Sequence, residues 1–300
     1  MYFFCTFACM EFVLLSVICS VTVSVLLKLA RNRGLDTTQV IIWNYPVAGL
    51  LTFLFFTPEL HYLNHPEIPW TIYFLLAALL PSVFFALGAS IRTVGIVRTE
   101  VAQRLSLVIP LIAAFTFFGE QLKIGTGIGL LIGLLAILFS IGWDKASTTI
   151  GSPKQSYTKF WLFPMLVFFG YGICDILFKR IAQITAIPYT TSMFFVFILA
   201  MILAFAYLLF ICLTKRNPFS IKAIWWGFVL GGFNFANILF YMKAHRALPE
   251  NPSIVFAGMN IGVISLGALV GVWVFKEKLS RFNQIGLLLA LLSVLVLTTS

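Results

Sequence analysis

The chain has 300 residues, of which 61% are hydrophobic and only 10% are charged, and its formal net charge is +10. A soluble globular protein is closer to half apolar and a quarter charged. The mean hydropathy of +1.02 therefore argues against a water-soluble fold and indicates a protein embedded in a lipid bilayer. Its basic residues lie in short runs between apolar segments, which is typical of membrane loops and argues against a nucleic-acid-binding face.

Ten apolar segments follow one another along the chain, each about as long as a membrane-spanning helix. We expect helices throughout, because an open strand edge in lipid would leave backbone groups without hydrogen bonds. The prediction is an all-α integral membrane protein with ten transmembrane helices and short connections. The segments are Phe12–Leu29, Thr38–Phe56, Trp70–Ile91, Val101–Gly119, Gly125–Trp143, Phe160–Phe178, Thr190–Ile211, Ile224–Tyr241, Ile254–Phe275 and Asn283–Thr298.

The longest polar connection, 144–158, divides the chain into two halves of five spans. We predict a first half over 10–145, a linker over 146–157 and a second half over 158–300. Met10 is an alternative start, because the first span reads naturally from the residue that follows it.

The two halves resemble each other in sequence. The element FGEQL at 118–122 is echoed by FKEKL at 275–279, and IGLL at 128–131 returns as IGLL at 285–288, at the same offset. The repetition of several matches in the same order predicts an internal repeat.

The first spans of the two halves also align, with Lys28 opposite Lys179. Five spans per unit place the second unit upside down in the membrane relative to the first. Such inverted repeats are typical of transporters, in which two near-equivalent halves alternate access to a midplane site. A duplicated channel or scaffold is the alternative.

The element that closes the fourth span and opens the fifth, together with its echo, resembles the drug/metabolite transporter superfamily, specifically its EamA-like family. The resemblance covers nearly the whole chain, and the second copy departs from the first by having Lys276 where the first has Gly119. The resemblance implies two five-helix repeats around a central cavity, and export or exchange of amino acids, metabolites or drugs. It does not name a substrate.

Ionisable side chains inside an apolar span are costly, so each is a candidate for a functional residue. Asp175 and Lys179 lie one turn apart in the sixth span and are expected to pair. The pair is either a substrate or proton site, or a local ion pair with Lys179 reaching the membrane surface.

The start of the fourth span repeats this spacing with Glu100 and Arg104, beside Gln103. A buried guanidinium there suits a carboxylate, because its planar fork matches two oxygens. An ion pair at the beginning of a helix is the alternative.

Amides form a further set of candidates. Asn234, Asn237 and Tyr241 share one face of the eighth span, Asn260 enters the ninth where Gln103 stands in the first repeat, and Asn44 lies in the second. Uncharged amides facing a cavity suit a polar solute, whereas hydrogen bonds between helices are the alternative.

Other features are expected to be structural. Glycines at four-residue intervals from Gly125 to Gly133 predict close helix contact within the bundle, with homodimerisation as the alternative. Glu120 and Glu277 are interpreted as anchors at the membrane surface, and the histidines of the 57–69 loop as solvated rather than metal-binding. Prolines are expected to kink spans at Pro46, Pro81, Pro110 and Pro164.

The function predicted is a secondary carrier, in a bacterial inner membrane, for a small metabolite or drug. No nucleotide-binding motif points to ATP, so a proton, a counter-solute or the solute's own gradient would drive transport. A membrane enzyme is less favoured, because the ten acidic residues are scattered. We expect no cofactor, metal or nucleic acid, the five cysteines as apolar packing residues, and a monomer, with a dimer as the alternative.

Orientation depends on two conflicting arguments. The connections after odd-numbered spans carry most of the lysines and arginines, and the positive-inside rule then places both termini outside. The family resemblance implies that both termini lie inside.

Overall fold

The structure, a computed structural model, consists of helices joined by short loops in its described residues. These are 2–94, 96–121, 123–140, 157–215, 220–275 and 281–299. The helices are α1 (Tyr2–Asn32), α2 (Thr37–Phe56), the 3₁₀-helix η1 (Leu60–Asn64), α3 (Trp70–Val94), α4 (Ile96–Leu105), α5 (Val108–Thr116), α6 (Ile124–Ser140), α7 (Tyr157–Gln183), α8 (Tyr189–Lys215), α9 (Ile221–Ala247), α10 (Pro252–Phe275) and α11 (Arg281–Thr299).

Within these residues, seven helices are long and apolar enough to cross a membrane, by length and composition. Three shorter apolar helical segments, Ala102–Thr116, Ile124–Phe139 and Gln284–Leu297, occupy the fourth, fifth and tenth expected spans. The chain is therefore a multi-pass membrane protein. The expected linker, apart from Tyr157, and the second Glu-containing element, apart from Phe275, lie outside the described residues.

The fourth expected span is broken into two helices, α4 and α5. The break falls at Ser106 and Leu107, and Pro110 follows in the first turn of α5. A proline ring clashes with the carbonyl four residues earlier, which here belongs to Ser106, and tolerates the first turn of a helix. By contrast, Pro46, Pro81 and Pro164 lie inside single continuous helices.

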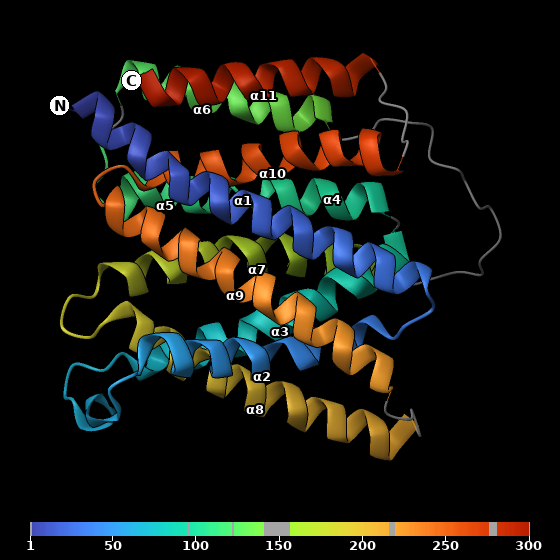
Figure 1. The fold of residues 1–300 in the computed structure, drawn as a ribbon. Coiled ribbons are helices and arrows are strands. Elements are labelled where there is room, and N and C mark those ends of the chain that lie inside the picture. The colour runs from blue at the N-terminus through green and yellow to red at the C-terminus, as the bar shows by residue number, and fades with distance from the viewer. Residues whose placement is uncertain are drawn as a thin grey trace.

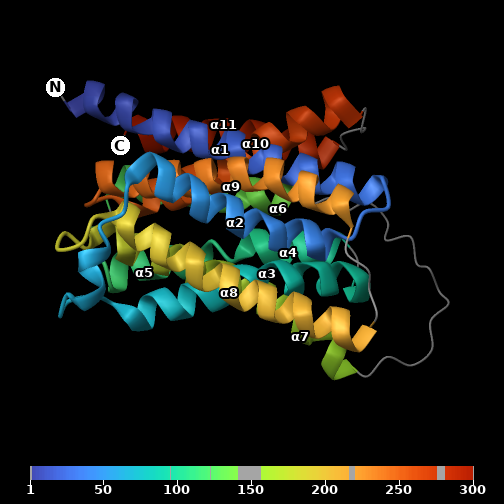
Figure 2. The ribbon, with the colours of Figure 1, turned by 60° about the horizontal axis from the view of Figure 1, so that its bottom comes forward.

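Helices of the first half pack mainly on helices of the second. In Figures 1 and 2 α1 lies against α9 and α10, α2 lies between α8 and α9, and α3 contacts α7 and α8. The pair α6 and α11 forms one edge of the bundle, beside α10 (Figure 1). Consecutive helices, such as α1 and α2, make few contacts with each other.

Glycines permit the closest of these contacts. A Cβ atom at Gly231 of α9 would lie 2.7 Å from the carbonyl oxygen of Asn44 in α2, and one at Gly129 of α6 would lie 2.8 Å from the Leu297 side chain in α11. A Cβ atom at Gly133 would meet Ser293 of α11 at 2.9 Å. Gly129 and Gly133 are therefore used for packing within the bundle, as expected from their spacing.

Candidate functional site

A hydrogen-bonded carboxylate joins α7 and α9 inside the bundle. Tyr241 of α9 is buried, and its hydroxyl donates to Oδ1 of Asp175 in α7 over 2.8 Å. Both residues were singled out from the sequence, and the structure brings them together. A carboxylate among apolar helices is costly unless it is paired, so this contact marks the strongest candidate site in the described chain.

The ion pair expected between Asp175 and Lys179 is not formed in the described structure. Lys179 is fully buried and donates instead to the carbonyl oxygens of His245 (3.3 Å) and Pro249 (3.0 Å) at the end of α9. Its side chain does not reach the membrane surface, so that alternative is wrong as well. Asp175 and Lys179 lie one turn apart on α7, but they have different hydrogen-bond partners.

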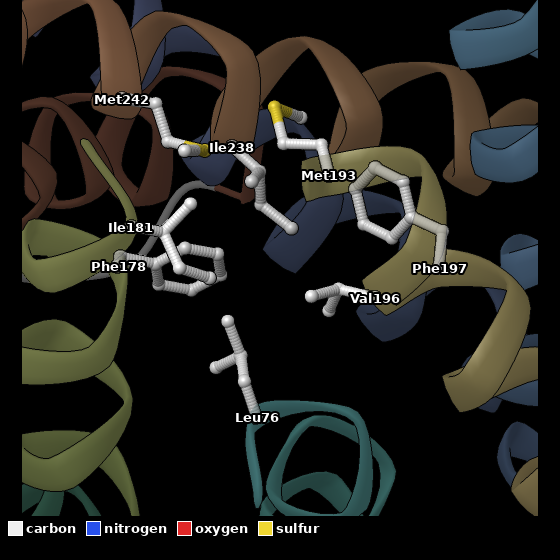
Figure 3. A pocket seen from close by; sticks show the side chains of 8 residues that line it. All are labelled: Leu76, Phe178, Ile181, Met193, Val196, Phe197, Ile238 and Met242. Atoms are coloured by element: carbon white, nitrogen blue, oxygen red, sulfur yellow. The ribbon is translucent and has the colours of Figure 1, made fainter. Parts of the chain in front are cut away.

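A narrow apolar cavity, with no room for a water molecule in this structure, lies close to Tyr241, the partner of Asp175. It is lined entirely by apolar side chains from α3, α7, α8 and α9 (Figure 3). Phe178 lines it, and the ring of Phe178 meets that of Tyr241 edge-on with centroids 6.1 Å apart. The lining residues are Leu76, Phe178, Ile181, Met193, Val196, Phe197, Ile238 and Met242.

Polar groups of α2 and α4 lie around Tyr171, which precedes Asp175 by one turn of α7. Tyr171 of α7 interacts electrostatically with both Asp175 and Arg104, which lies in α4. Tyr45 of α2 is 1% exposed, interacts electrostatically with Tyr171, and has no hydrogen-bond partner for its hydroxyl group. Arg104, a predicted site residue, therefore lies within electrostatic range of Tyr171, whereas the side chain of Glu100 lies outside the described set.

The amides of α9 fasten neighbouring helices. The Asn234 side chain donates to Oδ1 of Asn44 in α2 over 2.8 Å, and both residues are buried. Ser16 of α1 lies with its hydroxyl 2.8 Å from Oδ1 of Asn237. For these residues the structure favours the alternative of hydrogen bonds between helices, because each of them makes a side-chain hydrogen bond to another helix.

The last two predicted site residues make contacts within their own helical segments. Asn260 donates to the carbonyl oxygen of Phe256, one turn earlier in α10. The Gln103 carbonyl accepts the Ser106 hydroxyl at the break after α4, and its side chain is half-buried. Neither residue is hydrogen-bonded to Asp175 in the described structure.

Two buried groups were not expected at all. Glu120, interpreted as a surface anchor, is 7% exposed and accepts hydrogen bonds from the Ser253 N–H (3.0 Å) and from the Ser253 hydroxyl. The recurrence of this glutamate in both halves was the signal in the sequence. No signal in the sequence pointed to Ser253, which lies at the start of α10.

No group of three or more His, Cys, Asp or Glu side chains is placed to hold a metal ion in the described part of the chain. In the 57–69 loop, His61 instead lies 3.3 Å from Glu59, and both side chains are mostly exposed.

Comparison with known proteins agrees with a membrane bundle of this type. The sequence profile of the EamA-like transporter family matches residues 8–142. An uncharacterized protein of Haemophilus influenzae is 37% identical over 293 residues, which are 96% of this chain and 97% of that protein.

A solved crystal structure shares the fold, with a TM-score of 0.70, 16% sequence identity and coverage of 96% of each chain. The profile match includes the Glu120 element, and the relative from Haemophilus influenzae aligns with the chain almost from end to end, so the chain belongs to the EamA-like transporter family.

Proposed function

We propose that the protein is a secondary transporter that exports a small metabolite or drug, and that Asp175 and Tyr241 form its binding site. The observation that carries the proposal is the carboxylate of Asp175, half-buried inside a membrane bundle and hydrogen-bonded to Tyr241. Ionisable groups at such positions mark substrate or proton pathways by default.

The surroundings of Asp175 support a solute with a cationic group. No ion pair with this carboxylate is present in the described structure, and the nearby Lys179 donates to backbone carbonyls instead. An ammonium group of a solute would supply the missing positive charge, and a proton would do so between transport cycles. The apolar side chains of the narrow cavity beside Tyr241 suit a hydrophobic part of the same solute, which would enter when the helices of the two halves move apart. An amphipathic amine, such as an amino acid with an apolar side chain, fits both features.

The packing of the helices supports alternating access by two related halves. The α1 helix packs on α9 and α10, and the corresponding helix of the second half, α7, packs on α3, α4 and α5. The α2 helix packs on α9 as α8 packs on α3, and α6 packs on its own counterpart, α11. This pairing is the same when the halves are exchanged, as expected of inverted repeats that rock around a shared site.

The test is solute flux in vesicles reconstituted with purified protein. A panel of radiolabelled amino acids and organic cations is screened for saturable uptake and for counterflow, which separates a carrier from a channel. For any solute transported by the wild type, Asp175→Asn is expected to abolish transport, because the neutral amide no longer attracts the cation. Tyr241→Phe is expected to weaken binding about 10-fold, as for loss of one hydrogen bond to a charged group.

The matched control is Glu59→Gln, which neutralises an exposed carboxylate that does not line the cavity. Its transport should equal that of the wild type. Unchanged flux in Asp175→Asn, with the protein inserted at the same density, contradicts the assignment of the site.

A further inference from the structure

Two charged side chains are buried together at the end of the bundle where α7 and α9 end and α10 begins. Lys179 is 0% exposed and Glu120 is 7% exposed. They come from different halves, because Glu120 precedes α6 and Lys179 lies near the end of α7. Burying charges is costly unless each has specific partners, so the contacts of both groups are informative.

Glu120 binds the beginning of α10. Its two carboxylate oxygens accept the backbone N–H and the hydroxyl of Ser253, the second residue of that helix. The first N–H groups of a helix have no partner within the helix, and its N-terminus carries partial positive charge. The carboxylate therefore holds the start of α10 from the first half of the chain.

Lys179 binds the end of α9 in the complementary way. Its ammonium group donates to the carbonyl oxygens of His245 and Pro249, which lie at the negative end of that helix. Lys179 and Glu120 also attract each other electrostatically. We call this set the latch: Glu120, Lys179, Ser253 and the carbonyl groups of His245 and Pro249.

The latch lies one helical turn beyond the proposed site, toward the end of the bundle where α7 and α9 end. Lys179 follows Asp175 by one turn of α7, and His245 follows Tyr241 by one turn of α9, so about 6 Å along the helices separates the two levels. The His245 ring fills the interval, with its centroid 4.7 Å from the Tyr241 ring and 4.8 Å from the Phe256 ring.

Equivalent lysines of the two halves differ in burial at the two ends of the bundle. The α1 helix ends on the opposite side of the bundle from the ends of α7 and α9 (Figure 1). Lys28, which aligns with Lys179 in the repeat, is exposed at that other end, whereas Lys179 is completely buried. The same residue type is therefore enclosed at one end only.

We propose that the latch is the gate that closes this end of the transporter, and that it opens when Glu120 releases α10 and Lys179 releases α9. This inference rests on the proposed transport function. In the structure described here, the gate is closed. Because the latch joins the α5–α6 connection of the first half to α7, α9 and α10 of the second, rocking of the halves against each other must break it.

The test is the accessibility of a cysteine placed behind the gate. Met242, which lines the cavity, is replaced by cysteine in a protein whose natural cysteines have been changed to alanine, and a membrane-impermeant thiol reagent is added to one side of sealed, oriented vesicles. Labelling from the latch side should be slow. Glu120→Gln and Lys179→Gln should each raise its rate roughly 10-fold or more, the scale set by losing a hydrogen bond to a charged group. The cysteines removed are Cys5, Cys9, Cys19, Cys174 and Cys212.

Two further variants sharpen the result. Ser253→Ala removes the hydroxyl but keeps the N–H group, so it should give a smaller increase than Glu120→Gln. Glu59→Gln neutralises an exposed carboxylate in the α2–α3 connection, at the same end of the bundle, and should change nothing. Equal labelling rates in wild type and Glu120→Gln overturn the proposal.

Loss of folding gives a different pattern, because an unfolded bundle reacts from both sides of the vesicle and an opened gate only from the latch side. An increase from both sides therefore also overturns the proposal. The assay needs no solute, so it is independent of the flux test. Asp175→Asn should leave labelling from the latch side as slow as in the wild type, whatever its effect on transport.

Discussion

Glu120 is subject to opposing influences on its proton affinity. Burial raises the pKa of its carboxyl above the ordinary 4.5, and the contacts with Ser253 and the nearby Lys179 lower it by less. Because the folded protein then holds this proton more tightly than the unfolded chain, stability should fall as the pH rises from 4.5 to the raised pKa and level off above it. Thermal unfolding in detergent across this range measures the effect. The difference between wild type and Glu120→Gln isolates it, and a difference independent of pH contradicts it.

Individual residues differ in how far the sequence predicts their roles. Asp175 and Tyr241 can be singled out, because polar groups within apolar segments require a reason. Their pairing cannot, since it depends on which faces of α7 and α9 meet in space. Lys179 was expected to pair with Asp175 or to reach the surface. The end of α9, which offers it free carbonyl groups, becomes its neighbour only in the folded bundle.

At the scale of helices, two neighbouring glycines of α9 allow a specific prediction about its contact with α2. A Cβ atom at Gly231 would lie 2.7 Å from the Asn44 carbonyl oxygen and 2.8 Å from Val47, whereas one at Gly232 would meet nothing within 4 Å. We expect Gly231→Ala to destabilise the protein by about 1–3 kcal/mol, as for other overpacked sites. Gly232→Ala should be close to neutral. Unfolding in mixed micelles compares the two, and equal stabilities contradict the close packing.

The helices themselves were largely predictable, because a membrane span needs only a sufficient length of apolar sequence. The break between α4 and α5 was not. Four prolines were treated alike as kinks, yet only Pro110 follows an interruption, at Ser106 and Leu107. The other three lie inside continuous helices, so a proline alone does not decide between a kink and a break. The interrupted segment packs against α7 and α10.

At the scale of the whole molecule, both termini lie at the same end of the bundle (Figure 1). The opposite end carries the α1–α2 connection, with Arg33, and the ends of α3 and α8. Since basic connections remain in the cytoplasm, we predict that both termini lie on the outer face. Impermeant labelling of a single cysteine added at either terminus, in intact cells, measures this. Labelling of only one terminus contradicts an even number of spans, and labelling of neither contradicts the orientation.

The division into two halves could be inferred from the spacing of repeated motifs, but the partners of each helix could not. Apolar helices present similar surfaces in every direction, so hydropathy alone does not indicate that α1 packs on α9 rather than on α2. That choice depends on small residues and on a few polar contacts, such as Ser16 with Asn237 and Asn234 with Asn44.

The packing of each half onto the other also affects how the protein is made. When a ribosome has delivered α1 to α6 into the membrane, their main partners, α7 to α11, have not yet been synthesised. Ser16 and Asn44 then lack their final hydrogen-bond partners, which lie on α9. The first half must therefore persist as an unassembled insertion intermediate, exposed to quality-control proteases, until α9 emerges. Two separately expressed halves should consequently be short-lived alone and stable when produced together.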